Sequence, residues 1–396
     1  MTYRGMTLIF GFKFKLPGLL VKYTKAKDIK THNLQYFKHG TLPLVIHSGN
    51  SAEFGKSHLE QWIPVFKRAN ISFFILVRNI PLYNYCVQRW SDVPCAYARL
   101  VEDVDKVLEY LSTNGRVFYL SNTGNSSSIL RRNDIQHIFL GHGDSNKFAS
   151  AHKFFRVYDE IWVASDAHLD RFKNANFETR HLVLKKIGRP MLKELIHINR
   201  KEEWKERIPR IALYAPTWEG VEECNNGSSV KASKEIIQTL LNYGFHVRVK
   251  FHPATGKRLK NYLKIENEIK KITLKNIEKI SLYSKESSLY SLMVNCAFCI
   301  GDNSGVITDF LSCNCPIAIY KSNDNVVTSK ANTSYSEFCY EWHTLQDFEE
   351  IVKEIAKGND NKTQNRRLAE EYYLGLSITE NELFFQMLNT NNVIEK

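Results

Sequence analysis

Short runs of apolar residues alternate with longer segments in which apolar positions recur every three or four residues. In the first half, a buried strand over 41–48 ends in a turn at Gly49, a mostly helical segment spans 52–69, and a second strand spans 71–77. A strand, a helix and a strand in this order form a β-α-β unit with both strands parallel in one sheet. Further strands of this half are predicted over residues 116–120, 135–140, 158–163 and 181–187.

The same alternation begins again after residue 209. Strands are predicted over 210–215, 245–251, 279–283, 296–300 and 316–320, and helices over 233–242, 286–294, 306–313, 345–357, 364–372 and 378–389. No period of 20–50 residues repeats, which excludes solenoids and propellers. The predicted fold class is α/β, with two doubly wound, Rossmann-like domains that face each other across a cleft in a GT-B-like arrangement.

The chain has 396 residues, more than one domain of ordinary size. The pattern divides it into a basic amphipathic segment (1–40), a first α/β domain (41–195), a charged linker (196–209) and a second α/β domain with C-terminal helices (210–396). A helix that crosses between the domains also fits the charged stretch.

Positive charge is in excess, with a formal net charge of +12. This favours anionic partners: nucleic acid, anionic lipid or a phosphorylated polymer. The first 30 residues carry seven basic residues against one acidic residue (7 − 1 = +6) interleaved with aromatic and aliphatic residues. They are too charged to span a bilayer and lack the form of a secretory signal. We expect a cytoplasmic protein whose N-terminal segment lies on the anionic inner face of the cell membrane, although an ordinary packed strand and helix would also fit.

The chain has 8 cysteines. Cys296 and Cys299 fall within one predicted strand, where residues three apart point to opposite faces, and no second Cys-x-x-Cys or Cys-x-His completes a zinc site. Buried free thiols in a reducing compartment, without a bound metal, are therefore expected.

Polar residues follow three of the predicted strands in the second half. After the strand over 296–300, a small polar turn containing Ser304 and Gly305 precedes a helix, so backbone N–H groups there favour an anion, although Ser304 also suits a simple N-cap. The strand over 247–251 delivers Lys250 and His252 to the same edge, and the strand over 211–215 ends in a polar and aromatic turn.

These segments resemble the CDP-glycerol glycerophosphotransferases of teichoic-acid and capsule synthesis. The family has similar segments, in the same order, to residues 214–218 (YAPTW), 250–253 (KFHP) and 300–310 (IGDNSGVITDF). Departures from the family occur at Glu219, Gly301, Asn303 and Gly305, which leaves the identity of the donor open. The resemblance implies a donor-binding role for Thr217, Lys250, Asp302, Ser304, Gly305 and Asp309 and a catalytic role for His252. We expect Lys250, His252 and the helix end at Ser304 to hold the negative charge of the donor's diphosphate. We identify no Asp-x-Asp pair to hold a divalent ion, so we expect transfer without a metal or other cofactor, with Asp302 and Asp309 as caps, orienting groups or ligands of sugar hydroxyls.

One further segment, in the first half of the chain, contains candidate catalytic residues. A strand ends at Gly141, and His142 stands between it and Gly143, which exposes the imidazole at the end of a parallel strand. Asp144 and Lys147 follow on what we take to be the acceptor side. The family has a corresponding His-Gly, and the resemblance implies that His142 is the catalytic base.

The leading hypothesis is a transferase that moves an alditol phosphate, most simply glycerol phosphate from CDP-glycerol, to a hydroxyl of a lipid-linked or growing cell-surface polymer. One alternative keeps the fold and uses a CMP-activated or other nucleotide sugar. A second alternative is a polyanion-binding protein without catalysis. No RNA-binding, helix-turn-helix or zinc-finger pattern is present, so nucleic acid is not an expected partner.

Overall fold

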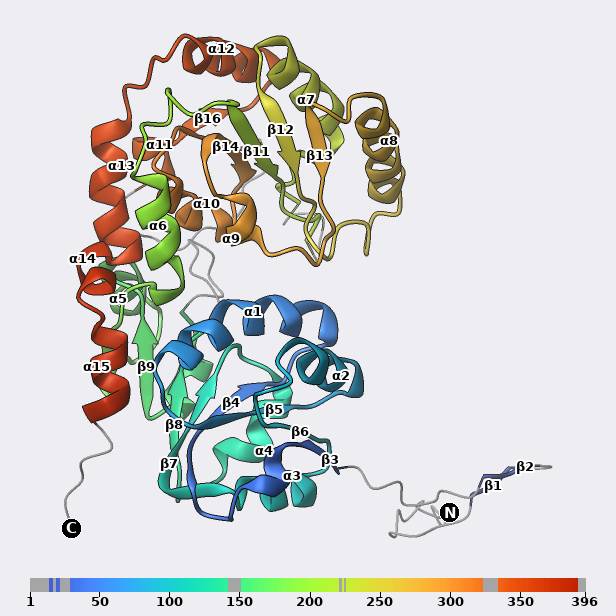
Figure 1. Ribbon diagram of the computed structural model, residues 1–396, viewed down its shortest axis with the longest axis vertical. Helices are drawn as coiled ribbons and strands as arrows, with labels where there is room; N and C mark the ends of the chain where they lie inside the picture. The colour runs from blue at the N-terminus through green and yellow to red at the C-terminus, as the bar shows by residue number, and fades with distance from the viewer. Residues whose placement is uncertain are drawn as a thin grey trace, which may run out of the picture.

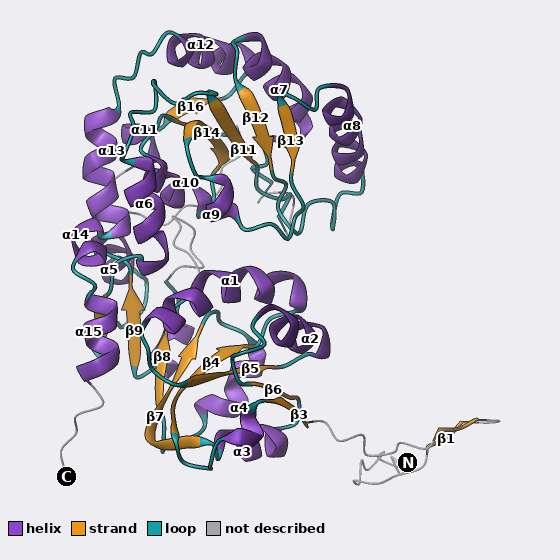
Figure 2. Cartoon of the chain, viewed as in Figure 1, coloured by secondary structure: helices purple, strands orange, loops and turns teal. Residues whose placement is uncertain are grey.

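The computed structural model describes residues 29–141, 151–220, 223, 226–322 and 334–390, together with the backbone of two short paired strands, β1 (Phe14–Leu16) and β2 (Leu19–Val21). Two sheets, each flanked by helices, lie one above the other along the long axis (Figure 1; Figure 2). The predicted α/β class with two parallel sheets is confirmed. No helix in the described ranges is long and apolar enough to cross a membrane.

The first sheet has eight strands in the order β10-β9-β8-β7-β4-β5-β6-β3, and all pairs are parallel except β3 with β6. The strand order reverses beside β4, which lies between β5 and β7. Its strands are β3 (Ile29–His32), β4 (Leu42–Ser48), β5 (Phe73–Val77), β6 (Cys95–Ala98), β7 (Leu111–Tyr119), β8 (Gln136–Phe139), β9 (Glu160–Val163) and β10 (Leu184–Lys186). The helices of this half are α1 (Ala52–Arg68), α2 (Ile80–Arg89), α3 (Val101–Leu108), α4 (Ser127–Leu130) and α5 (Asp166–Lys173). The next helix, α6 (Lys193–Asn199), packs on the core of the second domain.

The second sheet is parallel throughout, in the order β13-β12-β11-β14-β15-β16. This is the order of a dinucleotide-binding fold, which binds ligands beyond the carboxyl ends of the strands where the order reverses, here between β11 and β14. Its strands are β11 (Ile211–Ala215), β12 (His246–Val249), β13 (Ile280–Leu282), β14 (Cys296–Asp302), β15 (Ile317–Tyr320) and β16 (Tyr340–Trp342). The helices are α7 (Ser233–Asn242), α8 (Asn261–Lys275), α9 (Leu289–Leu292), α10 (Val306–Phe310), α11 (Tyr335–Phe338) and α12 (Leu345–Ala356).

The C-terminal helices run back along the molecule (Figure 1). After α13 (Thr363–Ala369) and α14 (Leu376–Glu380), α15 (Leu383–Thr390) buries Phe384 and Leu388 in the core of the first sheet. The Phe384 ring lies 5.5 Å from both the Trp62 and the Phe66 ring. Although the sequence pattern places residues 378–389 with the second domain, the last helix packs on the first domain and ties the two together.

The charged stretch over 196–209 packs on the second domain. Asn199 is fully buried at the end of α6, and its side-chain amide donates to the carbonyls of Met293 (3.2 Å) and Ser312 (3.1 Å). Arg207 is also buried, with all of its hydrogen bonds in this region made to backbone carbonyls. The segment is therefore a packed connection and does not separate the domains as a solvated linker would.

Candidate active site between the two sheets

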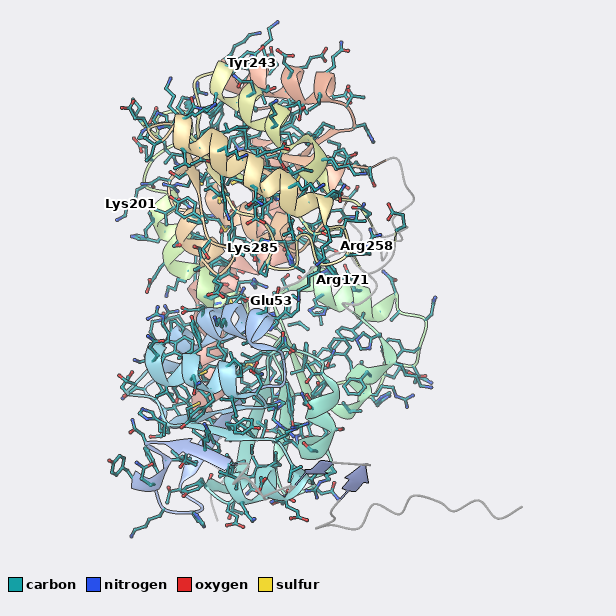
Figure 3. The ribbon with its side chains drawn as sticks, turned by 90° about the vertical axis from the view of Figure 1, so that its right-hand side faces the viewer. Glu53, Arg171, Lys201, Tyr243, Arg258 and Lys285 are labelled. Atoms are coloured by element: carbon teal, nitrogen blue, oxygen red, sulfur yellow. The ribbon has the colours of Figure 1, made fainter. Side chains whose placement is uncertain are left out.

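A cavity of about 680 Å³ lies between the two domains. Its first wall comes from α1 and from loops that follow β4, β7 and β8, and its second wall from loops that follow β11, β12 and β14. Ion pairs cross its rim, because Lys56 on α1 contacts Glu286 (3.1 Å) and Glu53 contacts Lys257. Figure 3 shows Glu53 at the boundary of the two domains. The cleft predicted from the strand pattern is therefore present, with strand ends of both sheets opening into it.

Lys250 and His252 lie together on the second wall. The Lys250 N–H donates to the carbonyl of Tyr214 (3.0 Å), so the residue directly after β12 is held against β11. Burial lowers the pKa of the Lys250 ammonium to about 8, because removal from water disfavours the charged form. A cation that is poorly hydrated in the free protein is well suited to pair with a phosphate.

The His252 ring is held in one orientation. Its Nδ1 accepts a hydrogen bond from the Ala254 N–H (3.0 Å), and the ring stacks on Trp218 with centroids 6.1 Å apart. Because Nδ1 is an acceptor, the neutral imidazole carries its proton on Nε2. The arrangement presents a hydrogen-bond donor at the edge of the cavity.

Thr217 lines the cavity, whereas Asp302 lies beneath it. The Asp302 carboxylate is fully buried and accepts from the N–H groups of Thr217 (2.7 Å) and Ser229 (3.2 Å). Asp302 thus fixes the Thr217 loop across two strands and acts as a positioning residue, and it is not among the residues that face the cavity.

Ser304 and Gly305 line the cavity at the start of α10. Gly305 is the residue that precedes the helix, no side chain caps it, and the Ser304 carbonyl accepts from the Ile307 N–H (3.1 Å). The interpretation of Ser304 as an N-cap of α10 is therefore wrong. The predicted strand also continues two residues further, to Asp302, so the turn is tighter than the apolar run indicates.

Asp309 faces the same cavity but is already paired. Its Oδ1 accepts from the Arg189 guanidinium at 2.6 Å, and both side chains are buried. Arg189 also donates to the Tyr290 hydroxyl (3.0 Å), and burial raises the pKa of that hydroxyl. Arg189 belongs to the segment after β10, so this ion pair joins the two domains at the base of the cleft.

Glu219 departs from the family pattern and points away from the cavity. It is fully buried, and its carboxylate accepts from the N–H groups of Gly256 (3.1 Å), Arg258 (2.9 Å) and Leu259 (3.0 Å). Burial alone would raise its pKa, but these backbone hydrogen bonds outweigh that effect and lower it. Glu219 holds the loop that follows Lys250 and His252 and is not among the residues that line the cavity.

The first wall presents hydrogen-bonding groups from outside the segments that resemble the family. Ser121 donates to Asn50 Oδ1 (2.8 Å), and Asn50 Nδ2 lies 3.0 Å from His58 Nδ1. His152 lines the same wall, and burial lowers its pKa. The only signal for Asn50 and Ser121 in the sequence is their position just after a predicted strand, at the edge where parallel sheets keep their sites.

The predicted acceptor-side residues His142, Gly143, Asp144 and Lys147 lie outside the described residues. The described part of that strand end is Gly141, which borders the cavity with φ of 68° and whose carbonyl accepts from the Trp62 indole (2.7 Å). The chain therefore reaches the cavity immediately before His142.

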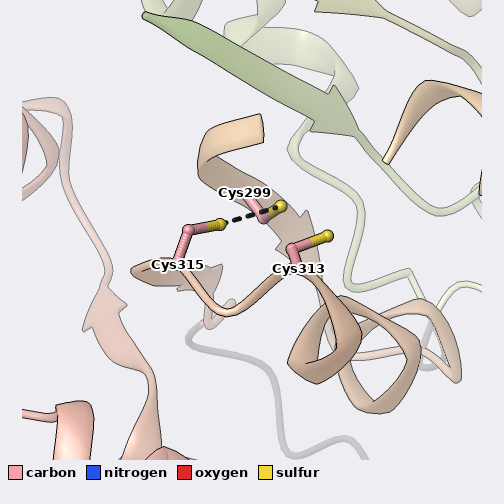
Figure 4. Close-up of side chains that lie close together, drawn as sticks. All are labelled: Cys299, Cys313 and Cys315. Atoms are coloured by element: carbon pink, nitrogen blue, oxygen red, sulfur yellow. Dashed lines mark hydrogen bonds between the residues drawn. The ribbon is translucent and has the colours of Figure 1, made fainter. Parts of the chain in front are cut away.

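Cysteine placement differs from the expectation. Seven cysteines are described, and all are buried free thiols, as predicted. However, the sulfur atoms of Cys299, Cys313 and Cys315 lie within 4.8 Å of one another (Figure 4). The sequence pattern considered only neighbours of the Cys296–Cys299 pair, whereas the fold brings Cys299 to Cys313 and Cys315 of the segment before β15. The chain does contain one Asp-x-Asp pair, Asp103 and Asp105, on α3. Asp105 forms ion pairs with Arg131 and Arg132, and neither aspartate lines the cavity.

A comparison with known proteins now settles the family. The profile described as CDP-Glycerol:Poly(glycerophosphate) glycerophosphotransferase matches residues 120–374, well over half of the chain. The chain belongs to this family. The glycerophosphotransferase resemblance predicted from three short segments is thus confirmed, and the protein is a transferase of this type. No curated protein matches the sequence.

Solved structures show the same fold. The wall teichoic acid polymerase TagF matches with a TM-score of 0.57 and 12% identity over 91% of this chain and 92% of that chain. A TagF variant matches with a TM-score of 0.59, 11% identity and the same coverage. The UDP-GlcNAc 2-epimerase from Methanocaldococcus jannaschii matches with a TM-score of 0.51 and 14% identity over 87% of this chain and 99% of that chain. At these identities the likeness supports the two-domain fold alone.

Proposed function

We propose that this glycerophosphotransferase moves glycerol phosphate from CDP-glycerol to a hydroxyl of a lipid-linked or growing cell-surface polymer. The observation that carries the proposal is the second wall of the cavity, where Lys250, the His252 imidazole and the Ser304–Gly305 turn meet. A cation, a ring N–H and backbone N–H groups are the ligands that a diphosphate requires. Among the solved structures, a TagF variant was soaked with CDPG, which is consistent with such a donor.

In the proposed reaction, an acceptor oxygen attacks the β-phosphorus of the donor in line. Its proton passes to His142, the bond from that phosphorus to the bridging oxygen breaks, and CMP leaves with the electron pair. Lys250 and His252 stabilise the negative charge that grows on the leaving phosphate. Because the protein's own cations supply this charge, we propose that the transfer needs no divalent metal.

The acceptor lies along the first wall in this proposal. Asn50, Ser121, His58 and His152 offer hydrogen-bond donors and acceptors, which suit the hydroxyl groups of an alditol or sugar residue. The family relationship supports a polymer acceptor. The basic segment over residues 1–30 lies mostly outside the described residues, and we propose that it keeps the enzyme on the anionic inner face of the cell membrane.

The decisive experiment offers the purified full chain a panel of CDP-alditols and nucleotide sugars and identifies products by mass spectrometry. CDP-glycerol should yield an acceptor heavier by one glycerol phosphate, with CMP released in equal amount. Transfer of a sugar from a CMP-sugar, with no reaction of any CDP-alditol, would replace the proposal by the nucleotide-sugar alternative.

A pair of variants tests whether His142 acts in catalysis while His252, on the second wall, acts in donor binding. His142→Ala should lower kcat by roughly 10²- to 10⁴-fold while leaving the affinity for CDP near that of the wild type. His252→Ala should instead weaken CDP binding about tenfold or more, because it removes a hydrogen bond to a charged phosphate. Equal loss of CDP binding in both variants would show that His142 is not the base on the opposite wall.

A further inference from the structure

Cysteines 299, 313 and 315 form a compact group of sulfur atoms in the second domain, and none of them lines the cavity between the domains. Cys299 lies in the middle of β14, Cys313 ends the short helix η8 (Leu311–Cys313), and Cys315 comes just before β15 (Figure 4). All three are at most 1% exposed. The sulfurs of Cys299 and Cys315 are 3.6 Å apart, and all three lie within 4.8 Å of one another.

These spacings match the size of a thiolate metal site. An ion bound to sulfur at about 2.3 Å places its sulfur ligands about 3.8 Å apart in tetrahedral geometry. The closest pair already has this separation, and the longest pair needs to contract by about 1 Å or less. Sulfur ligands select thiophilic ions such as Zn²⁺ and Cu⁺ over Mg²⁺ or Ca²⁺.

A fourth cysteine, Cys296, lies on β14 beside a backbone irregularity. The pairing of β11 with β14 shifts register, so that Ile211 faces Cys296 but Ala212 faces Phe298. A bulge of this kind changes the direction of the side chains that precede it. Burial raises the pKa of the Cys299 thiol, and Cys296 lies close enough to raise it further, but the Cys296 thiol donates to the carbonyl of Leu292 (3.1 Å), so its side chain must turn to complete the group. The chain brings a Cys-x-x-Cys pair (296 and 299) to a Cys-x-Cys pair (313 and 315), a set of ligands that the sequence does not show to be adjacent.

Two guanidinium groups supply the opposite charge. Arg207 is buried, and its Nη1 donates to the carbonyls of Cys296 and Cys313, the latter at 3.0 Å. The Arg248 guanidinium lies 3.9 Å from the Cys296 sulfur and donates to the carbonyls of Leu292 and Val294. A buried cation requires a nearby negative charge. A divalent ion with four thiolates carries −4 + 2 = −2, which two arginines balance.

We propose that Cys299, Cys313 and Cys315, with Cys296 as the fourth sulfur, bind one thiophilic metal ion, for which Zn²⁺ has the preferred geometry. The ion joins β14, η8 and the start of β15. These elements flank α10, which carries part of the second wall of the cavity. The metal therefore has a structural role behind that wall and takes no part in the chemistry of the cleft. Deprotonation of the thiols accompanies binding, and the released protons pass to solvent during folding.

The test is the metal content of the full chain, produced in zinc-supplemented medium under reducing conditions and purified without chelators. We expect about one zinc per chain by elemental mass spectrometry. Cys299→Ser and Cys313→Ser should reduce zinc to background. Cys86→Ser is the matched control, because Cys86 is equally buried but lies in the first domain, and this variant should retain the metal.

A second measurement needs no variant, in case the serine substitutions prevent folding. Wild-type protein produced with Cd²⁺ in place of zinc should show an ultraviolet charge-transfer band of cadmium thiolates, and a mercurial reagent that blocks thiols should release the ion. Wild-type protein with no bound metal, or zinc that persists in folded Cys299→Ser, would overturn the proposal. An intramolecular disulfide between Cys299 and Cys315 in place of the metal would overturn it too. None of these measurements depends on transferase activity.

Discussion

Lys250 should make donor binding sensitive to alkaline pH. Its ammonium is partly buried on the donor wall, and the pKa is lowered to about 8 because the charged form has lost water. Only the protonated form attracts a diphosphate. Affinity for the donor is therefore highest at pH values below this pKa, and it falls as the pH rises through the pKa.

The size of the effect follows from the protonated fraction. A group with a pKa of about 8 is about 90% protonated at pH 7 and about 9% protonated at pH 9. Because bound phosphates hold the proton in the complex, the Kd for CDP should rise about tenfold over this interval, or about 1.4 kcal/mol. The phosphates change little over this interval, since their last pKa is near 6 and they are already about 90% ionised at pH 7.

Titration calorimetry with CDP at several pH values measures this directly. Lys250→Met should bind more weakly at pH 7 and show no change from pH 7 to pH 9. His252→Ala is the matched control, because it should weaken binding at every pH yet retain the alkaline fall. Constant affinity of the wild type over this range, or an alkaline fall that persists in Lys250→Met, would refute the role assigned to the Lys250 charge.

Four other outcomes are expected. Lys250→Met should raise the thermal midpoint, because at neutral pH the buried ammonium costs up to about 3 kcal/mol; a lower midpoint would contradict this. Asp302→Asn should lower the free energy of unfolding, measured in urea, by about 2–4 kcal/mol, because two buried N–H groups lose a charged acceptor. Weaker CDP binding with unchanged stability would instead show direct contact with the donor. Turnover should survive EDTA, and complete loss that Mg²⁺ restores would contradict metal-independent transfer. Deletion of residues 1–30 should release the protein from anionic liposomes, and sedimentation equal to that of the full chain would exclude the N-terminal anchor.

Local pattern predicted most of the strands and several helices. The helix over 233–242 and the strands near 211–215 and 317–320 have the predicted bounds within one residue. The apolar pattern predicts no element between residues 78 and 115, where the structure has α2, β6 and α3. Four-residue β6 is too short for a periodic signal, and β3 is recognisable only by its pairing with β6 at the edge of the sheet.

The grouping of Thr217, Lys250, His252 and Ser304 was also predictable from sequence. Each follows a strand, and parallel strands bring their carboxyl ends to one edge of a sheet, so residues about 90 apart reach one cavity. Side-chain direction was not predictable in the same way. Asp302 and Glu219 stand beside cavity residues in the sequence, but both turn inward to satisfy backbone N–H groups of other loops.

The sequence by itself thus determined the alternation of strands and helices, the division into two sheets and the edge at which the chemistry lies, because these depend on the periodicity of neighbouring residues. Only the tertiary structure decided which polar groups face the cavity, that Arg189 pairs with Asp309 across the domains, that α15 returns to the first sheet, and that Cys299 meets Cys313 and Cys315. Those features depend on contacts between residues far apart in the chain, and no local propensity encodes them.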